Sequence, residues 1–254
     1  MAGWVDTHCH LFLLEEDPRA VVERAVGAGV SWMVCPGIDL ESSLQARAIA
    51  ARHPERVLWS AGLHPHDAAQ WQEQRGRIGA LALEADAIGE CGLDFYRDRS
   101  PRDLQRAAFT DQVALAGEMD KPIIVHVRDA FSDVYDILGQ AGLGERAVMH
   151  CWTGGPRWTK RFRDLGVTFS FAGPITYETA DDIRRGAAEA PPERTLVETD
   201  SPFLTPVPYR GETNRPELVA RNGEALAAVW GLDVEQVAAS SSAHAAHVFG
   251  APGD

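Results

Sequence analysis

The chain has 254 residues, of which 45% are hydrophobic and 24% are charged. This composition is that of a globular protein with enough apolar material for a buried core, so it argues against a disordered chain. The chain holds 24 Lys and Arg against 37 Asp and Glu, which gives a formal net charge of −13. That balance excludes a protein whose whole surface attracts nucleic acid or anionic lipid, although metal ions can still supply positive charge at one site.

Nothing in the sequence indicates a membrane or secreted protein. No apolar run approaches the ~20 residues of a membrane span, and the first residues lack the basic and then apolar order of a signal peptide. Cys9, Cys35, Cys91 and Cys151 form no CxxC pair, which argues against a zinc ribbon and a disulfide framework. We therefore expect a cytoplasmic protein with reduced thiols and no membrane partner.

A short apolar, β-prone run followed by a segment with helical spacing recurs along the chain. The expected strands are Trp4–Cys9, Trp32–Gly37, Val57–His64, Ala87–Leu93, Pro122–Val127, Ala147–Trp152, Val167–Ala172 and Thr195–Asp200. The expected helices between them include Pro18–Ala28, Leu40–Arg52, Pro101–Met119, Phe131–Ala141, Pro156–Leu165 and Glu178–Ala190. Prolines near the start of several of these segments are typical of a first helical turn.

Continuous hydrophobic runs are typical of parallel strands that are covered on both faces. Eight strand–helix units in about 250 residues have the count and length of a TIM barrel. A doubly wound sheet also alternates strand and helix, but it usually carries a glycine-rich phosphate loop after its first strand, where this chain has His-Cys-His. The pattern predicts one α/β domain over residues 1–254, a (β/α)8 barrel with extra C-terminal helices at about Pro216–Trp230 and Val234–His247.

Potential metal ligands occur at the ends of five predicted strands. His8 and His10 end the first strand, where residues two apart point to the same side and can grip one ion. The other strand ends carry Glu90, His126, His150 and Asp200. Barrel active sites lie at the carboxyl ends of the strands. Four imidazoles and two carboxylates there predict one or two divalent ions, Zn²⁺ or Mn²⁺ more naturally than Mg²⁺.

The same spacing extends the site toward a substrate. Arg128 and Trp152 each lie two residues beyond a proposed histidine ligand, so they are expected to face the barrel mouth. Arg128 would contact an anionic group and Trp152 would stack a base or close the pocket. Asp94, on a turn out of the fourth strand, and His64, at the end of the third, are expected to contact substrate. His64 is also a candidate catalytic residue that orients substrate or acts on the leaving group.

Neighbours of the proposed ligands are expected to have supporting roles. Glu198 lies one step deeper than Asp200 and is expected to orient a ligand or a water. Alternation along the strands would turn Cys9, Cys91 and Cys151 away from the mouth, as small buried hydrophobes under the helices. Loop, packing or solvent positions are expected for the remaining histidines, which are His53, His66, His244 and His247.

Six segments, spread over nearly the whole chain, carry a family resemblance in their order and spacing. They are Val5-Asp-Thr-His-Cys-His-Leu, Gly62-Leu-His-Pro-His, Ile88-Gly-Glu-Cys-Gly-Leu-Asp-Phe-Tyr, Pro122-Ile-Ile-Val-His-Val-Arg-Asp-Ala, His150-Cys-Trp-Thr-Gly-Gly and Glu198-Thr-Asp-Ser-Pro-Phe-Leu-Thr-Pro. In these segments the chain resembles the TatD family of metal-dependent deoxyribonucleases, which have an amidohydrolase-type TIM barrel.

The resemblance implies a metal site and an activity. It implies that the metal ligands are His8, His10, Glu90, His126, His150 and Asp200, with Glu90 bridging two ions. It implies hydrolysis of DNA, from a 3′ end, by metal-activated water. In this mechanism Asp200 would act both as a ligand and as the base that takes the proton of the water. The partner would then be DNA, as single strands or 3′ ends, and we expect the protein to be a monomer.

One loop departs from the family pattern and keeps a second function open. The family's loop usually reads like Arg-Gly-Lys-Arg-Asn-Glu-Pro, whereas this chain has Glu212 and Thr213 at the Lys and Arg positions. A less basic loop suits a smaller substrate. The alternative is therefore an ester hydrolase with the same site, such as a D-aminoacyl-tRNA deacylase or a small-molecule ester or lactone hydrolase. A non-catalytic scaffold is a third possibility, against which the complete ligand set argues.

Overall fold

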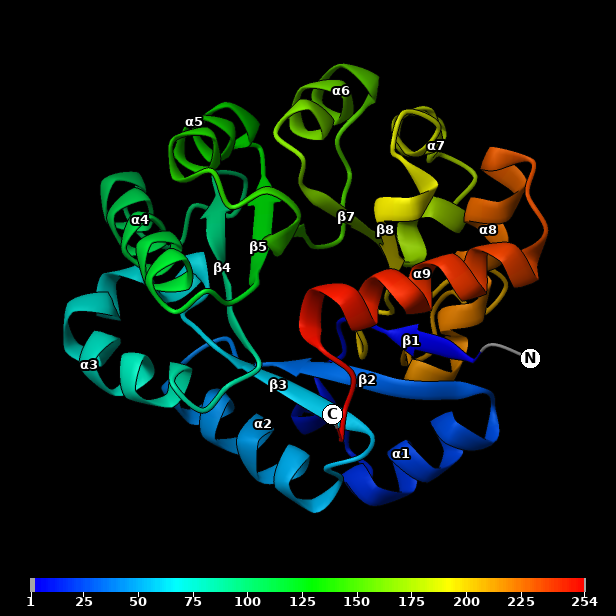
Figure 1. Cartoon of the computed structure of the whole chain (residues 1–254), viewed down its shortest axis with the longest axis horizontal. Coiled ribbons are helices and arrows are strands. Elements are labelled where there is room, and N and C mark those ends of the chain that lie inside the picture. Colours follow the sequence, from blue (N-terminus) through cyan, green and yellow to red (C-terminus); the bar gives the residue numbers. More distant parts are fainter. Residues whose placement is uncertain (1–2, 254) are drawn as a thin grey trace.

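The structure is a computed structural model that describes residues 3–253. Eight strands form one parallel sheet in chain order, as Figure 1 shows. The strands are β1 (Trp4–Asp6), β2 (Val30–Pro36), β3 (Val57–Ala61), β4 (Ala87–Asp94), β5 (Ile123–Arg128), β6 (Ala147–Met149), β7 (Thr168–Phe171) and β8 (Thr195–Val197). The fold is a (β/α)8 TIM barrel, and the doubly wound alternative is wrong.

The barrel closes just beyond the ends of its first and last strands. The Thr7 N–H donates to the Val197 carbonyl at 3.2 Å, and the Asp200 N–H donates to the His8 carbonyl at 2.8 Å. The buried Asp6 carboxylate accepts from the backbone N–H and the hydroxyl of Thr199, at 2.8 and 2.6 Å. Burial raises the pKa of Asp6 to about 8, although these bonds oppose the rise. This seam places His8 beside Asp200.

Helices form the outer ring. They are α1 (Pro18–Gly27), α2 (Leu40–Arg52), α3 (Trp71–Ala82), α4 (Arg102–Glu118), α5 (Phe131–Ala141), α6 (Pro156–Asp164), α7 (Asp181–Ala187), α8 (Val219–Trp230) and α9 (Val234–Phe249). Local chemistry sets several ends: Pro18 and Pro156 occupy first turns, and Asp39 caps α2. Left-handed glycines, Gly142 and Gly231, end α5 and α8.

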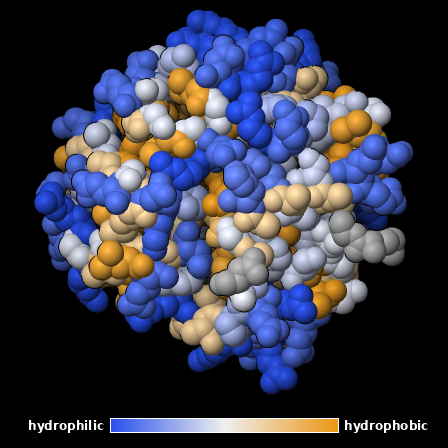
Figure 2. All heavy atoms as spheres, in the orientation of Figure 1, coloured by the Kyte–Doolittle hydropathy of each residue, from blue (hydrophilic) through white to orange (hydrophobic). Residues whose placement is uncertain are grey.

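The additional C-terminal helix α9 covers the end of the barrel at which the strands begin. Ala245, Val248 and Phe249 pack with apolar side chains from the strands, including Val5 and Leu196, in one buried cluster. Figure 1 shows α9 crossing in front of the barrel. The surface of this face is mostly hydrophilic with small, separate apolar groups (Figure 2). The opposite end, where the strands finish, is therefore the open one.

No helix within residues 3–253 is both long and apolar enough to pass through a lipid bilayer.

Candidate metal centre

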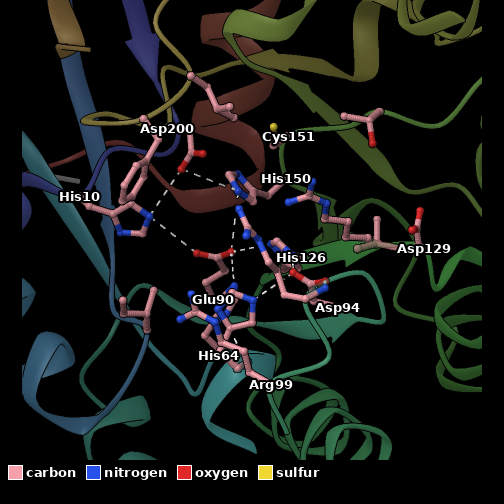
Figure 3. Close-up of a pocket in the computed structure, with 18 of the residues that line it drawn as sticks. His10, His64, Glu90, Asp94, Arg99, His126, Asp129, His150, Cys151 and Asp200 are labelled. Carbon is pink, nitrogen blue, oxygen red and sulfur yellow. Dashed lines mark hydrogen bonds and ion pairs between the residues drawn. The ribbon is translucent and has the colours of Figure 1, made fainter. Parts of the chain in front are cut away.

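A cavity of about 750 Å³ opens at the carboxyl end of the barrel. Its lining includes the candidate ligands His10, Glu90, His126, His150 and Asp200. Glu90 lies within β4, and the other four lie near the end of a strand or a few residues beyond it. The five side chains converge in Figure 3. Parallel strands bring their carboxyl ends to one rim, so residues far apart in the chain meet there.

Glu90 lies at the centre of this cluster because β4 carries an irregularity there. The pairing register of β4 against β5 shifts between Ile88 and Cys91, and Gly89 has φ +114°, which favours glycine. The Glu90 N–H donates at 2.7 Å to the carbonyl of Gly37, the residue that follows β2. Such bulges re-aim side chains beside active sites, and this one aims Glu90 into the cavity.

The two carboxylate oxygens of Glu90 face two different groups of imidazoles. Oε2 lies 3.3 Å from His8 Nε2 and 3.7 Å from His10 Nε2. Oε1 lies 3.1 Å from His126 Nδ1, 3.5 Å from His64 Nε2 and 3.7 Å from His150 Nε2. Glu90 thus has the position of a bridge between two ligand groups.

The first group is made by His8, His10 and Asp200. The two Nε2 atoms lie 3.2 Å apart, and Asp200 Oδ1 lies 3.7 Å from His8 and 3.5 Å from His10. Two ligands of a tetrahedral Zn²⁺ at 2.0–2.1 Å are separated by about 3.3 Å, so these atoms fit around one ion. Their ligand atoms are close enough to hold a metal, as are those of His64, Glu90 and His126.

Buried carboxylates contact the outer nitrogens of two of these histidines. Glu198 Oε1 lies 2.7 Å from His150 Nδ1, and it also accepts from the Cys151 N–H at 2.7 Å. Asp94 Oδ2 lies 3.4 Å from His126 Nε2 and 3.0 Å from His66 Nε2. A carboxylate in this position fixes the tautomer and ring orientation of a ligating histidine.

The imidazoles around Glu90 and Asp200 favour the ionised form of both carboxylates. Burial alone would raise the pKa of Glu90, but the imidazoles of His64 and His150 hold it well below its usual range. Burial would also raise the pKa of Asp200, but its hydrogen bond with His10 and the charge of His150 lower it. Burial would lower the pKa of His150, but Glu198 and Glu90 raise it to about 10. Carboxylates and imidazoles in the site thus stabilise each other's charged forms.

The structure corrects the expected position of two side chains beyond β6. Trp152 does not line the cavity: it is 1% exposed, and its indole N–H donates to Thr159 Oγ1 at 2.9 Å. Cys151, expected under the helices, instead lines the cavity. Because β6 ends at Met149 and Cys151 has φ +44°, the alternation of a strand does not extend to either residue.

Of the other predicted residues, His8 and Glu198 are buried and do not line the cavity, whereas the lining includes one histidine that was not predicted for the site. His64, Asp94 and Arg128 line it, as expected. His66 was expected on a loop without a role, but it lines the cavity and contacts Asp94. The signal was present in the sequence, because His66 lies two residues after His64 in the same motif.

The fold and this site define the class of the protein: a (β/α)8 barrel whose open end has an imidazole and carboxylate cluster suited to divalent ions. The family model of the TatD-related DNases matches residues 5–250. The chain therefore belongs to the TatD-related DNase family.

Individual relatives agree over nearly their full length. The metal-dependent hydrolase YabD of Bacillus subtilis is 35% identical over 250 residues, which cover 96% of this chain and 98% of the relative. The 3′-5′ ssDNA/RNA exonuclease TatD of Citrobacter koseri is 37% identical over 247 residues, 92% of this chain and 94% of the relative. The crystal structure of YJJV, a TatD homologue of Escherichia coli, superposes with a TM-score of 0.89 at 28% identity, covering 98% of both chains.

Proposed function

We propose that this protein is a metal-dependent phosphodiesterase that removes nucleotides from the 3′ end of single-stranded DNA. The observation that carries the proposal is the position of Glu90 between two groups of imidazoles at the floor of the cavity. The TatD of Citrobacter koseri, named as a 3′-5′ ssDNA/RNA exonuclease, supports the substrate and the polarity.

The residues present fit one or two divalent ions. His8, His10 and Asp200 would hold one ion, and His126 and His150 the other, with Glu90 shared between them. Bound there, the ions would polarise the phosphoryl group and lower the pKa of a water toward ~7. Zn²⁺ and Mn²⁺ suit this many imidazoles better than Mg²⁺.

The chain's own residues then have separate tasks. The nearby His10 and His150 stabilise the ionised carboxylate of Asp200, and this carboxylate is placed to accept the proton of the attacking water. Arg128 and His64 lie at the cavity wall, where they hold the phosphate and stabilise the charge that develops on it. Attack in line with the P–O3′ bond breaks that bond, so the terminal nucleotide leaves with the phosphate. The 3′-oxygen of the shortened strand takes up a proton from solvent.

The test is digestion of single-stranded DNA labelled at either the 5′ or the 3′ end. We expect stepwise shortening of the 5′-labelled strand and immediate release of the 3′-labelled nucleotide in the presence of Zn²⁺, Mn²⁺ or Mg²⁺. Asp200→Asn should lose most of the rate and retain the wild-type circular dichroism spectrum. If the folded, metal-loaded protein cleaves no DNA but hydrolyses D-aminoacyl or small-molecule esters, the nuclease proposal is wrong and the ester alternative takes its place.

A further inference from the structure

One side of the cavity is lined by three arginines, Arg97, Arg99 and Arg128, here called the arginine wall. The first two belong to the segment between β4 and α4, and the third ends β5. None of the three forms an ion pair with any residue of the described range 3–253. By contrast, Arg102 and Arg106 on the adjacent α4 pair with Asp98 and Asp133.

Asp94 connects the backbone at Arg97 with the proposed metal centre. Asp94 Oδ1 accepts from the N–H groups of Tyr96 and Arg97, at 3.0 and 2.7 Å, while its other oxygen contacts His126. The Arg128 guanidinium stacks over the Tyr96 ring, 3.9 Å from its centroid. Figure 3 places Asp94 and Arg99 across the cavity from His10 and Asp200.

Three of the carboxylates that share the cavity lining with the arginine wall, Asp67, Asp94 and Asp129, form no ion pair with it within the described residues. Asp94 is engaged by His66 and His126, and Asp67 accepts a hydrogen bond from Gln70. Asp129 is the other carboxylate on this side of the cavity lining. Three guanidinium groups without an ion-pair partner, in a chain of net charge −13, can contact an anionic group of a ligand.

The opposite side of the cavity is apolar. Leu13, Phe203 and Leu204, here called the apolar wall, line the cavity and are 41%, 52% and 36% exposed. The Phe203 N–H donates to the Asp200 carbonyl at 2.8 Å, and its ring centroid lies 6.2 Å from that of His10. An exposed aromatic ring held beside the ligands is a stacking surface for a base.

The loop that holds Glu212 and Thr213 places neither of its arginines, Arg210 and Arg215, in the lining of the cavity. Arg215 lies 3.5 Å from Glu217 and 4.0 Å from Glu212, and Arg210 stacks over Tyr177 at 3.8 Å. Cationic contact with a substrate is thus one-sided, through the arginine wall. A ligand that fills the cavity meets positive charge on one side and an aromatic face on the other.

We infer that the arginine wall and the apolar wall together hold the end of a nucleic-acid strand in one orientation relative to the metal centre. The terminal base stacks on Phe203, and Arg97 and Arg99 bind the backbone phosphate next to the one being cleaved. This inference rests on the proposed function and deepens it: the substrate must carry a second phosphate and a base, which a small ester or a lone phosphodiester lacks.

The test compares two substrates that share the reaction but differ in these features. One is a thymidine homopolymer, and the other is bis(p-nitrophenyl) phosphate, which has no second phosphate. For the double variant Arg97→Ala, Arg99→Ala we expect KM for the homopolymer to rise about tenfold or more. Its kcat and its hydrolysis of bis(p-nitrophenyl) phosphate should stay within about twofold of wild type. The control Arg77→Ala, on the exposed face of α3, should change neither.

Phe203 is tested in the same assays by Phe203→Ala and Phe203→Tyr. Phe203→Ala should raise KM for the homopolymer about tenfold. Phe203→Tyr should leave KM near the wild-type value, because the tyrosine ring can still stack on a base. Leu83→Ala, at an exposed apolar side chain on the far end of α3, is the matched control.

Binding gives a readout that does not depend on turnover. Fluorescence anisotropy of a labelled homopolymer on chelator-treated protein measures affinity against salt concentration. Because both arginines bind the same phosphate, removing them should reduce the slope of log K against log salt by about 0.7. Unchanged slope and unchanged KM in the double variant overturn the inference while leaving the proposed function intact. If wild-type protein hydrolyses neither substrate, the proposed function fails and the inference falls with it.

Discussion

At the scale of one residue, Glu198 shows how a buried carboxylate can orient His150, a proposed metal ligand. Glu198 is 1% exposed. Its Oε1 lies 2.7 Å from His150 Nδ1, and its Oε2 accepts a hydrogen bond from the Ser170 hydroxyl at 2.6 Å. These contacts hold the imidazole with Nε2 directed at Glu90. Partners of this kind raise ligand basicity and fix the ring orientation.

Glu198→Gln should therefore weaken metal binding without removing a ligand. We expect the affinity for Zn²⁺ to fall roughly 10- to 100-fold, because the amide no longer stabilises the correct tautomer of His150. Competition against a chromogenic chelator measures this affinity, with Glu193→Gln, an exposed carboxylate on the surface, as the control. An unchanged Zn²⁺ affinity in Glu198→Gln would show that Glu198 has no part in holding the ligand.

At the scale of the elements, the sequence predicted the fold well and the geometry beyond the strands less well. Continuous apolar runs located every strand to within a few residues, since burial on both faces leaves a clear pattern. α2 and α5 have the predicted bounds. Several strands, however, end earlier than expected, including β1 at Asp6 and β6 at Met149, while β4 and β5 end one residue later.

The short strands explain which site residues could be predicted. Metal-type residues near the ends of parallel strands gather at one rim, so the topology alone predicts a cluster there. The central position of Glu90 could not be predicted, because it depends on the irregularity of β4. Side-chain direction depends on φ and ψ, and Cys151 has a positive φ that no period-two rule anticipates. That is why the expected position of Trp152 was wrong, whereas the position of His66 could have been predicted from its spacing to His64.

Trp152 gives a test at this scale. Its ring packs against Phe131, Phe162 and Phe169, with centroids 5.0–5.4 Å away. Trp152→Ala should lower the free energy of unfolding by about 3–5 kcal/mol, because it leaves a cavity under α5 and α6. Urea unfolding measures the loss, and Leu83→Ala, 69% exposed, should change it by less than about 0.5 kcal/mol. A kinetic defect with normal stability would place the indole in the active site instead.

At the scale of the whole molecule, the two ends of the barrel have separate roles. The closed end, under α9, is apolar and structural, while the open end has the imidazole cluster and the two unlike walls. His244 on α9 illustrates the closed end: it is 7% exposed, and its Nε2 lies 2.8 Å from Thr168 Oγ1. Burial lowers the pKa of His244 to about 4, with the nearby Glu145 opposing the shift.

This shift gives the pH dependence of stability a definite sign. In the unfolded chain His244 titrates near 6.5, so between pH 6.5 and 4 only the unfolded state takes up its proton. The contribution of His244 to the free energy of unfolding is therefore fully present above pH 6.5 and is lost as the pH falls toward 4. From pH 7 to 5, wild type should lose roughly 1–2 kcal/mol more than His244→Gln, measured by urea unfolding of chelator-treated protein. Equal losses in the two proteins would contradict a neutral, buried His244.

The central claim is that the cluster around Glu90 binds divalent ions and that this binding enables phosphodiester hydrolysis. Its most direct test is a metal titration of chelator-treated protein in which bound ions per chain and hydrolysis of single-stranded DNA are measured on the same samples. We expect no hydrolysis without metal, and activity that rises with occupancy and saturates at no more than two ions per chain. Full activity in protein proven free of metal would contradict the account.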